Sequence, residues 1–366
     1  FASANRGRST ARRAATVSAL RPDWETAGET TEQSRSRTFR ADILAQPANL
    51  ERAAATFLAA LGRAELRRFQ ADPVVFTGMG ASLLAGVPAA QTLRAGGRLA
   101  LAMPATEVVD PGGERVGAAF VAVSQSGRSA ETVAALRAVD RPRLALANMM
   151  TSPLADVADL ILPIGSIPDA GISVLTYTAT LLAGAALAAV LLTGEFHANA
   201  GALAEAVAAL LEPADAVAER VSSRLQDVRA VDVIGQGFSA ASAGYGALLI
   251  REAARIPASG FDTHQYLHGP LEVAEAGMGA VLLGAEREVG LAGYLASAGV
   301  TVLLIPDTDV RVPDGVEVIR LPDVPAPLRP ILEAIPLQLL ADHLARARGL
   351  APGVFRHHQD DTKVKP

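Results

Sequence analysis

Two stretches of this sequence repeat one pattern, a short apolar run that ends in a turn of small residues and leads into a helix. The first stretch begins with residues 73–82 (PVVFTGMGAS) and the second with residues 230–239 (AVDVIGQGFS). Further short apolar runs alternate with helical patterns after each of them. Because such runs are typical of parallel strands that helices cover on both faces, the repetition predicts two similar α/β modules.

The sequence also indicates where the elements of each module lie. In the first module, strands are expected within 73–82 and over 99–103, 117–124, 143–148 and 159–164, with helices from Thr38 and over 83–94 and 130–139. In the second, strands are expected within 230–239 and over 279–283, 300–305 and 316–321, with helices ending near Arg255 and over 328–347. The expected domains are 38–197 and 198–350, joined by an Ala-rich helical stretch over 198–225, and a tail over 351–366 is expected to close the site.

The composition is that of a chain with a large buried core. Half of the 366 residues are apolar and 19% are charged, and the length suits two domains of ordinary size. The net charge of −5 offers no basic stripe of the kind that binds nucleic acid. The sequence contains no cysteine, which excludes disulfides, thiolate zinc sites and a cysteine nucleophile from this chain and fits a reducing cytoplasm.

Two segments bear on where the protein resides. Residues 1–37 are rich in Arg, Ser, Ala and Thr without a sustained apolar period, so we expect them to be disordered, and they contain no apolar core of a signal peptide. Residues 172–192 carry no charge, but Ala, Thr and Gly among the leucines make them less apolar than a typical membrane span. We therefore expect a buried helix there, and no membrane partner.

A segment that we call the serine loop, residues 124–129, follows a buried strand and precedes a helix. Its polar side chains include Ser124, Gln125, Ser126 and Ser129. Hydroxyls, an amide and backbone N–H groups gather there at the helix end that favours anions, where ligands of open α/β sheets collect. The alternative is that Ser129 alone caps the following helix. Because a cap needs one hydroxyl and this loop has three, the sequence favours phosphate binding.

A second turn between strand and helix, residues 78–82, contains Gly78, Gly80 and Ser82. It resembles a dinucleotide-binding fingerprint, but the third glycine is missing and no acidic residue ends the following strand. A nicotinamide site is therefore poorly supported, and no cofactor is expected. Ser82 is instead predicted to offer a further hydroxyl to the same anion or to a sugar.

Two further residues, Glu252 and His268, are candidates for proton transfer. Glu252 lies in an otherwise apolar helical stretch, where burial raises the pKa of a carboxylate and suits it to move protons. His268 is followed by Gly269-Pro270, which fixes a bend beside the histidine. The alternatives are a solvated helix face for Glu252 and a packed loop residue for His268.

A metal site is weakly indicated at two places. His264, His268 and Glu272 have the spacing of successive helical turns, but the Gly-Pro pair interrupts a helix through them. A cluster near the C-terminus, His357-His358 with Asp360-Asp361, is more typical of a solvated tail. We therefore expect no metal.

In this order, the segments resemble the sugar-isomerase (SIS) domain family in its tandem form. The resemblance covers about residues 38–366 and rests on four places: Asp42 to Pro47, the serine loop, Asn148 with Ser152-Pro153, and Glu252 with His268-Gly269-Pro270. It implies two domains, each a flavodoxin-like five-stranded parallel sheet with helices on both faces. It also implies a homodimer whose active sites draw residues from both subunits.

The resemblance further implies a role for each candidate residue. The serine loop would hold the phosphate of a sugar with Ser82 nearby, and Ile172 would contact the sugar through its backbone. Glu252 would move a proton between C1 and C2, His268 would assist ring opening, and Lys363 is the best match to a catalytic lysine of the C-terminal tail. The second module has no serine loop, so one sugar-phosphate site per chain is expected.

Two functions follow from these observations. The first is an isomerase or deaminase that acts on a hexose or hexosamine 6-phosphate, with any amine chemistry using free ammonia. The alternative is a non-catalytic regulator that senses phosphosugars with the same fold. The presence of both Glu252 and His268 favours the enzyme.

Overall fold

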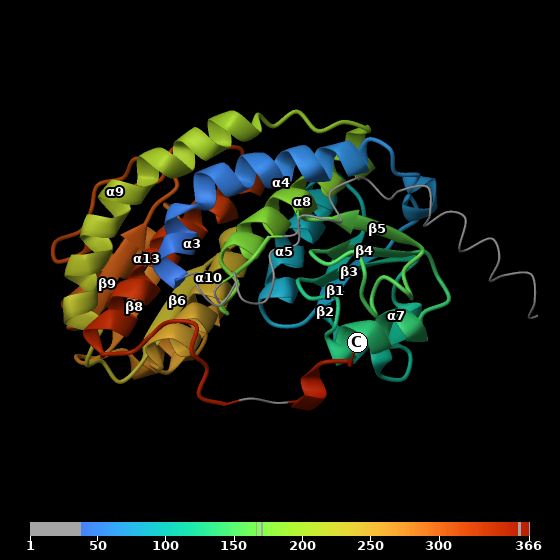
Figure 1. The fold of residues 1–366 in the computed structure, drawn as a ribbon. Coiled ribbons are helices and arrows are strands. Elements are labelled where there is room, and N and C mark those ends of the chain that lie inside the picture. Colours follow the sequence, from blue (N-terminus) through green and yellow to red (C-terminus); the bar gives the residue numbers. More distant parts are fainter. Residues whose placement is uncertain (1–37, 166, 170, 358–359, 366) are drawn as a thin grey trace, which may run out of the picture. The chain divides into compact units, whose positions relative to one another are not determined.

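The computed structural model describes residues 38–165, 167–169, 171–357 and 360–365, and it contains two sheets of five parallel strands each (Figure 1). Their strand orders are β2-β1-β3-β4-β5 and β10-β9-β8-β6-β7, which are the same order when each sheet is counted from its own first strand. This is the flavodoxin-like order, so the predicted fold class is confirmed. The segment 1–37, expected to be disordered, lies outside the described residues.

The first module contains five strands and six helices. The strands are β1 (Val74–Gly78), β2 (Ala100–Pro104), β3 (Ala119–Ser124), β4 (Arg143–Ala147) and β5 (Leu160–Pro163). The helices are α3 (Phe39–Leu44), α4 (Gln46–Leu61), α5 (Ala81–Ala95), α6 (Ala105–Val109), α7 (Ala130–Ala138) and α8 (Leu175–Thr193). Val74 and Phe76 pack with residues of α4, α5 and α8, whereas Val75 packs with residues of α6 and α7. Helices therefore cover both faces of the sheet (Figure 1).

The second module repeats this arrangement. The strands are β6 (Val231–Gly235), β7 (Ala258–Phe261), β8 (Gly279–Leu283), β9 (Thr301–Ile305) and β10 (Glu317–Val318). The helices are α9 (Ala200–Leu225), α10 (Ser239–Leu249), α11 (Thr263–Tyr266), α12 (Arg287–Ser297) and α13 (Arg329–Ala347). A single π-helical turn, Ile250–Ala254, continues α10. Short 3₁₀ turns lie at 66–69, 113–115, 270–273, 326–328 and 360–362.

Strand β7 is the one strand that the sequence pattern did not indicate. Its residues, ASGF, follow a proline and include a glycine, and these residue types are depleted in strands. The glycine has a packing role, because a Cβ on Gly260 would lie 2.7 Å from the Cα of Gly244 in α10. This edge strand is thus placed by close contact with a helix rather than by strand propensity.

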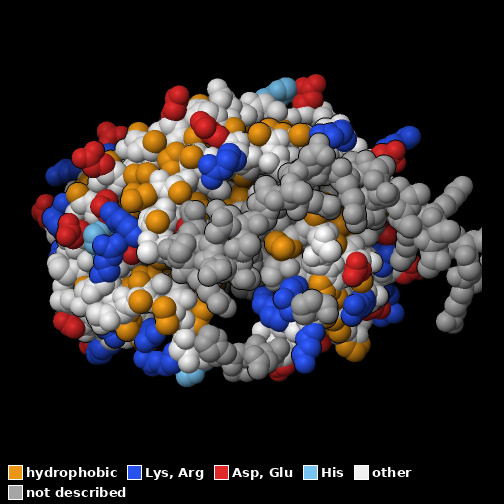
Figure 2. Space-filling model, in the orientation of Figure 1, with side chains coloured by type: hydrophobic (Ala, Val, Ile, Leu, Met, Phe, Trp, Pro, Cys, Tyr) orange, Lys and Arg blue, Asp and Glu red, His pale blue; other side chains and the backbone are white. Residues whose placement is uncertain are grey.

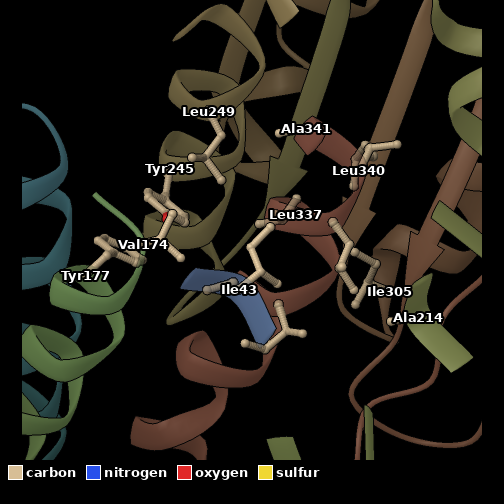
Figure 3. Packing of buried hydrophobic residues seen from close by; sticks show 14 of the residues in the cluster. Ile43, Val174, Tyr177, Ala214, Tyr245, Leu249, Ile305, Leu337, Leu340 and Ala341 are labelled. Atoms are coloured by element: carbon tan, nitrogen blue, oxygen red, sulfur yellow. The ribbon is translucent and has the colours of Figure 1, made fainter. Parts of the chain in front are cut away.

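The uncharged helix α8 lies in the core, as predicted. It is long and apolar enough to cross a membrane by composition alone, but 83% of its apolar window is buried inside the protein. Tyr177 of α8 stacks on Tyr245 of α10 with ring centroids 3.5 Å apart and planes 7° apart (Figure 3). Residues of α3, α4, α8, α9, α10 and α13 belong to one buried cluster, so the two modules share a hydrophobic core.

Candidate functional site

The serine loop is folded back on itself by its own hydroxyls. The Oγ of Ser124 accepts a hydrogen bond from the Gly127 N–H at 3.1 Å, and that of Ser126 accepts one from the Arg128 N–H at 3.2 Å. Gly127 has φ 62°, and a Cβ there would lie 2.2 Å from the Oγ of Ser152. Because each serine hydroxyl accepts from the backbone, its own O–H stays free to donate to an anion.

The alternative prediction for Ser129, that it merely caps α7, is wrong. Its side chain makes no cap hydrogen bond to the helix and instead lies 3.1 Å from a carboxylate oxygen of Glu131, to which it donates. The first N–H groups of α7 therefore have no side-chain cap from this residue. They remain available to an anion bound in the loop, where the helix dipole also favours negative charge.

The turn that carries Ser82 lies beside the serine loop. β1 pairs with β3 in the sheet, so the turns that follow these strands are neighbours. They come close together, because a Cβ on Gly78 would lie 2.8 Å from the carbonyl oxygen of Val123. Ser82 and Gln125 are both half-buried. The two turns flank the point where the strand order of a flavodoxin-like sheet reverses, which is the usual ligand position in such folds.

The end of the C-terminal tail docks onto the serine loop. The Val364 N–H donates to the Arg128 carbonyl at 2.8 Å, and the Arg128 Nε donates back to the Val364 carbonyl at 3.0 Å. Lys363 forms a backbone bridge with Ser129, and its Nζ donates to the Oγ of Ser126 at 3.4 Å. Figure 2 shows Lys and Arg side chains gathered around the place where this end lies in Figure 1. The tail thus brings positive charge to the loop.

Glu252 lies in the π-helical turn and lines a cavity of about 390 Å³. Three tail residues line the same cavity: Phe355, Arg356 and His357. Burial raises the pKa of Glu252 to about 7, as expected for a carboxylate in an apolar helical stretch. π-helical turns occur frequently at functional sites, and this turn holds a proton acceptor that titrates near neutrality.

The turn that contains Ile172 is joined to α10, the helix that the π-helical turn of Glu252 continues. The hydroxyl of Tyr245 donates to the carbonyl of Ser173 at 2.7 Å. The pKa of Tyr245 is raised chiefly by burial and further by Tyr177, Asp169 and Glu252. The C-terminal tail also contacts this turn. A Cβ added to Gly171 would lie 2.7 Å from the carbonyl oxygen of Gly353. The Ile172 side chain is buried.

One stretch of chain therefore connects all these features except His268. Gly353 contacts the turn at Gly171, residues 355–357 line the Glu252 cavity, and Lys363 and Val364 bind the serine loop. Sequence reasoning missed Tyr245, for which no motif gives a signal. His268 is exposed after α11, and within the described ranges no hydrogen bond or ion pair joins its side chain to Glu252 or to the serine loop.

No cluster of three or more metal-ligating His, Asp or Glu residues is found among the described residues. His264, His268 and Glu272, whose spacing weakly suggested a metal site, are among the described residues and form no such cluster. His358 of the C-terminal cluster lies outside the described residues.

The titration of Glu252 gives a prediction about stability. Its pKa rises from 4.5 to about 7 on folding, so the folded state binds the proton more tightly. The free energy of unfolding should therefore fall as pH rises through that window, by about 2 kcal/mol for a partly exposed carboxylate. Glu252→Gln should lack this loss, and denaturant unfolding of both proteins at pH 5 and pH 8 measures the difference. Parallel pH profiles would contradict the assignment.

The sequence of this chain is similar to glutamine–fructose-6-phosphate aminotransferases of several organisms. No family model matches it. It is 29% identical over 306 residues to a glutamine–fructose-6-phosphate aminotransferase (isomerizing) of Pyrococcus horikoshii, an alignment that covers 77% of this chain and 50% of that protein. The chain thus spans about half the length of the curated relatives it matches.

Solved structures show the same fold. The C-terminal domain of glucosamine-fructose-6-phosphate aminotransferase from Francisella tularensis superposes with a TM-score of 0.73 at 22% identity, covering 86% of this chain and 97% of that one. A glucosamine-6-phosphate deaminase from Thermotoga maritima gives 0.70 at 20% identity, covering 88% and 98%. These matches support the architecture of both modules together, since each covers most of this chain.

Proposed function

Because this chain is a tandem SIS-domain protein, related to the isomerase domain of the aminotransferases and to phosphosugar isomerases and deaminases, we propose that it acts on a hexose or hexosamine 6-phosphate. The reaction is proton transfer between C1 and C2, with isomerisation or deamination as its outcome. The observation that carries the proposal is the position of Glu252. It titrates near neutrality in a cavity lined by the same tail that reaches the serine loop.

In this proposal the serine loop holds the phosphate. Ser124 and Ser126 donate their hydroxyls, the N-terminus of α7 adds backbone N–H groups, and Gln125 adds its amide. Ser129 adds a third hydroxyl when it turns to the phosphate from Glu131, to which it donates in the structure. Ser82 reaches the phosphate or the sugar from the adjacent turn. The ammonium of Lys363, which lies 3.4 Å from the Oγ of Ser126, adds a charge-assisted bond and is a candidate for the catalytic lysine.

Glu252 then moves the proton. Its carboxylate removes the proton from C2 of the open-chain aldose. The C2–H electrons form the C1=C2 double bond, the C1 carbonyl electrons pass to the C1 oxygen, and that oxygen takes a proton, which gives a cis-enediol, or an enamine where C2 carries nitrogen. The protonated Glu252 then gives its proton to C1 while the oxygen or nitrogen on C2 loses a proton and becomes a ketone or an imine, and water hydrolyses the imine with release of ammonia. A pKa of about 7 suits both halves of this exchange, because the acid and base forms are similarly populated near neutral pH. The backbone around Ile172 fixes the sugar beside the carboxylate.

His268 has a separate place in the proposal. Since it is exposed and joined to neither Glu252 nor the serine loop by a described contact, we propose that it assists ring opening in the site of a partner subunit, within a homodimer. Mixing refolded Glu252→Gln and His268→Ala chains should then restore activity that each lacks. Random pairing makes half of the dimers mixed, each with one intact site, so about a quarter of the wild-type activity should return. No recovery on mixing would place His268 outside a shared site.

Solvent exchange tests the function as a whole. The protein is incubated in D₂O with glucosamine 6-phosphate, with fructose 6-phosphate with and without ammonia, and with related sugar phosphates. NMR follows loss of the C2 proton signal of the aldoses and of the C1 proton signal of fructose 6-phosphate. Exchange with at least one of them is expected. If the protein binds one of these compounds without exchange, the catalytic proposal fails and the function is that of a phosphosugar sensor.

A further inference from the structure

A second cavity, of about 430 Å³, lies beside the C-terminal end of α13. Its lining includes three arginines, Arg255, Arg348 and Arg356, with Asp227 as the one acidic residue. Arg255 and Arg356 also line the Glu252 cavity, so the two cavities are neighbours. The proposed reaction uses none of these arginines.

Two of the three guanidinium groups are held by neutral partners. Arg255 donates to the Val354 carbonyl at 3.1 Å, and Arg348 donates to the Gln226 carbonyl at 2.6 Å. Within the part of the chain that the structure describes, none of the three arginines forms an ion pair with a carboxylate, Asp227 included. Bonds to carbonyls fix a guanidinium in place without neutralising its charge. Three positive charges against one negative charge therefore leave an excess of positive charge in the cavity.

The backbone at Arg255 gives a second indication. With φ 56° and ψ 37° it is the one non-glycine residue of the described chain that has a positive φ. This left-handed conformation costs about 1 kcal/mol or more in a residue with a Cβ. Such strain persists where the surroundings hold it and occurs often at ligand sites. Here it sits at the end of the π-helical turn, at the boundary of both cavities.

We infer that this cavity binds a phosphate dianion, as a second anion site separate from the serine loop. Guanidinium groups match phosphate oxygens with paired hydrogen bonds. A phosphate monoester carries about −1.5 to −2 charges at pH 7, which balances the positive excess, whereas a single carboxylate would leave part of it unpaired. The cavity volume lies within the usual range for small-molecule sites.

Titration of the full chain with inorganic phosphate at low salt tests the inference. Isothermal calorimetry or equilibrium dialysis should find two phosphates per chain. Arg348→Gln should weaken one of them by about tenfold or more, and Ser126→Ala should weaken the other. Arg311→Gln removes the same charge from an exposed arginine outside the cavity and should retain both sites. Thermal unfolding establishes that every variant is folded.

The outcomes separate this site from the proposed function. One phosphate per chain, or equal binding by Arg348→Gln and Arg311→Gln, overturns the second site. If Ser126→Ala retains both phosphates, the serine-loop proposal fails while the arginine site stands. Titration of Ser126→Ala with a hexose 6-phosphate and with a nucleoside monophosphate shows which of these phosphate monoesters the arginine cavity binds. Whichever binds must lose about tenfold or more in affinity when Arg348→Gln is added.

Discussion

Glu252→Gln is expected to stop the exchange of the C2 proton of a bound sugar phosphate while leaving the sugar phosphate bound. Glutamine keeps the shape of the side chain and fills the same cavity, but it cannot accept a proton near neutral pH. Loss of a positioned general base costs about 10²–10⁴-fold in rate. NMR in D₂O measures the exchange rate, and calorimetry on the same samples measures the affinity.

Glu333→Gln is a matched control for this substitution. Glu333 is a fully buried carboxylate of the second module, its pKa is also raised by burial, and it accepts a hydrogen bond from Ser239. It lines neither described cavity. This variant should therefore keep the exchange. An exchange rate of Glu252→Gln within about twofold of wild type would assign the base to another residue.

Gly127→Ala is expected to remove phosphate binding at the serine loop. Alanine would have to adopt φ 62°, and its Cβ would stand 2.2 Å from the Oγ of Ser152, so the loop or Ser152 must move. Because the positive φ also disfavours alanine, we expect the loop to shift, which breaks the turn that aims the hydroxyls of Ser124 and Ser126. Loss of several such hydrogen bonds corresponds to about a hundredfold in affinity or more. Titration with a sugar phosphate that binds the wild-type protein measures this.

Gly194→Ala is a control that has the backbone cost of a positive φ but no steric clash of the added Cβ. Gly194 ends α8 with φ 86°, and no heavy atom lies within 4 Å of the position of a Cβ there. Its replacement should lower the free energy of unfolding by about 1 kcal/mol and leave affinity unchanged. Equal affinities of the two glycine variants would show that the serine loop does not bind the phosphate.

The sequence allowed most of the fold to be predicted, because buried parallel strands are continuous apolar runs bounded by small residues. Nine strands were indicated in this way, and β8 was placed at its observed bounds, Gly279–Leu283. β7 was not predicted, because Gly260 serves close packing against α10, and packing between distant segments leaves no local sequence pattern. β10 was expected over 316–321, but only Glu317 and Val318 pair with β9.

The candidate site was only partly predictable for a related reason. The serine loop is local in sequence, so its residue types and position after a strand were sufficient to suggest it. The hydrogen bond from Tyr245 to Ser173 joins two distant segments, and so does the contact of Lys363 with Ser126. Such contacts depend on how the modules pack. The failure of Ser129 as a helix cap likewise depends on a rotamer that no spacing reveals.

The stacked pair of Tyr177 and Tyr245 has a consequence for folding cooperativity. We propose that the boundary between the two α/β modules lies near residues 197 and 198. Helices of both modules contribute to one buried cluster, which includes this tyrosine pair. Separation of the copies would expose both aromatic rings and much of that cluster to water, a large cost. The described chain should therefore melt in one transition, and an anion held by the first module alone would raise the melting temperature of both.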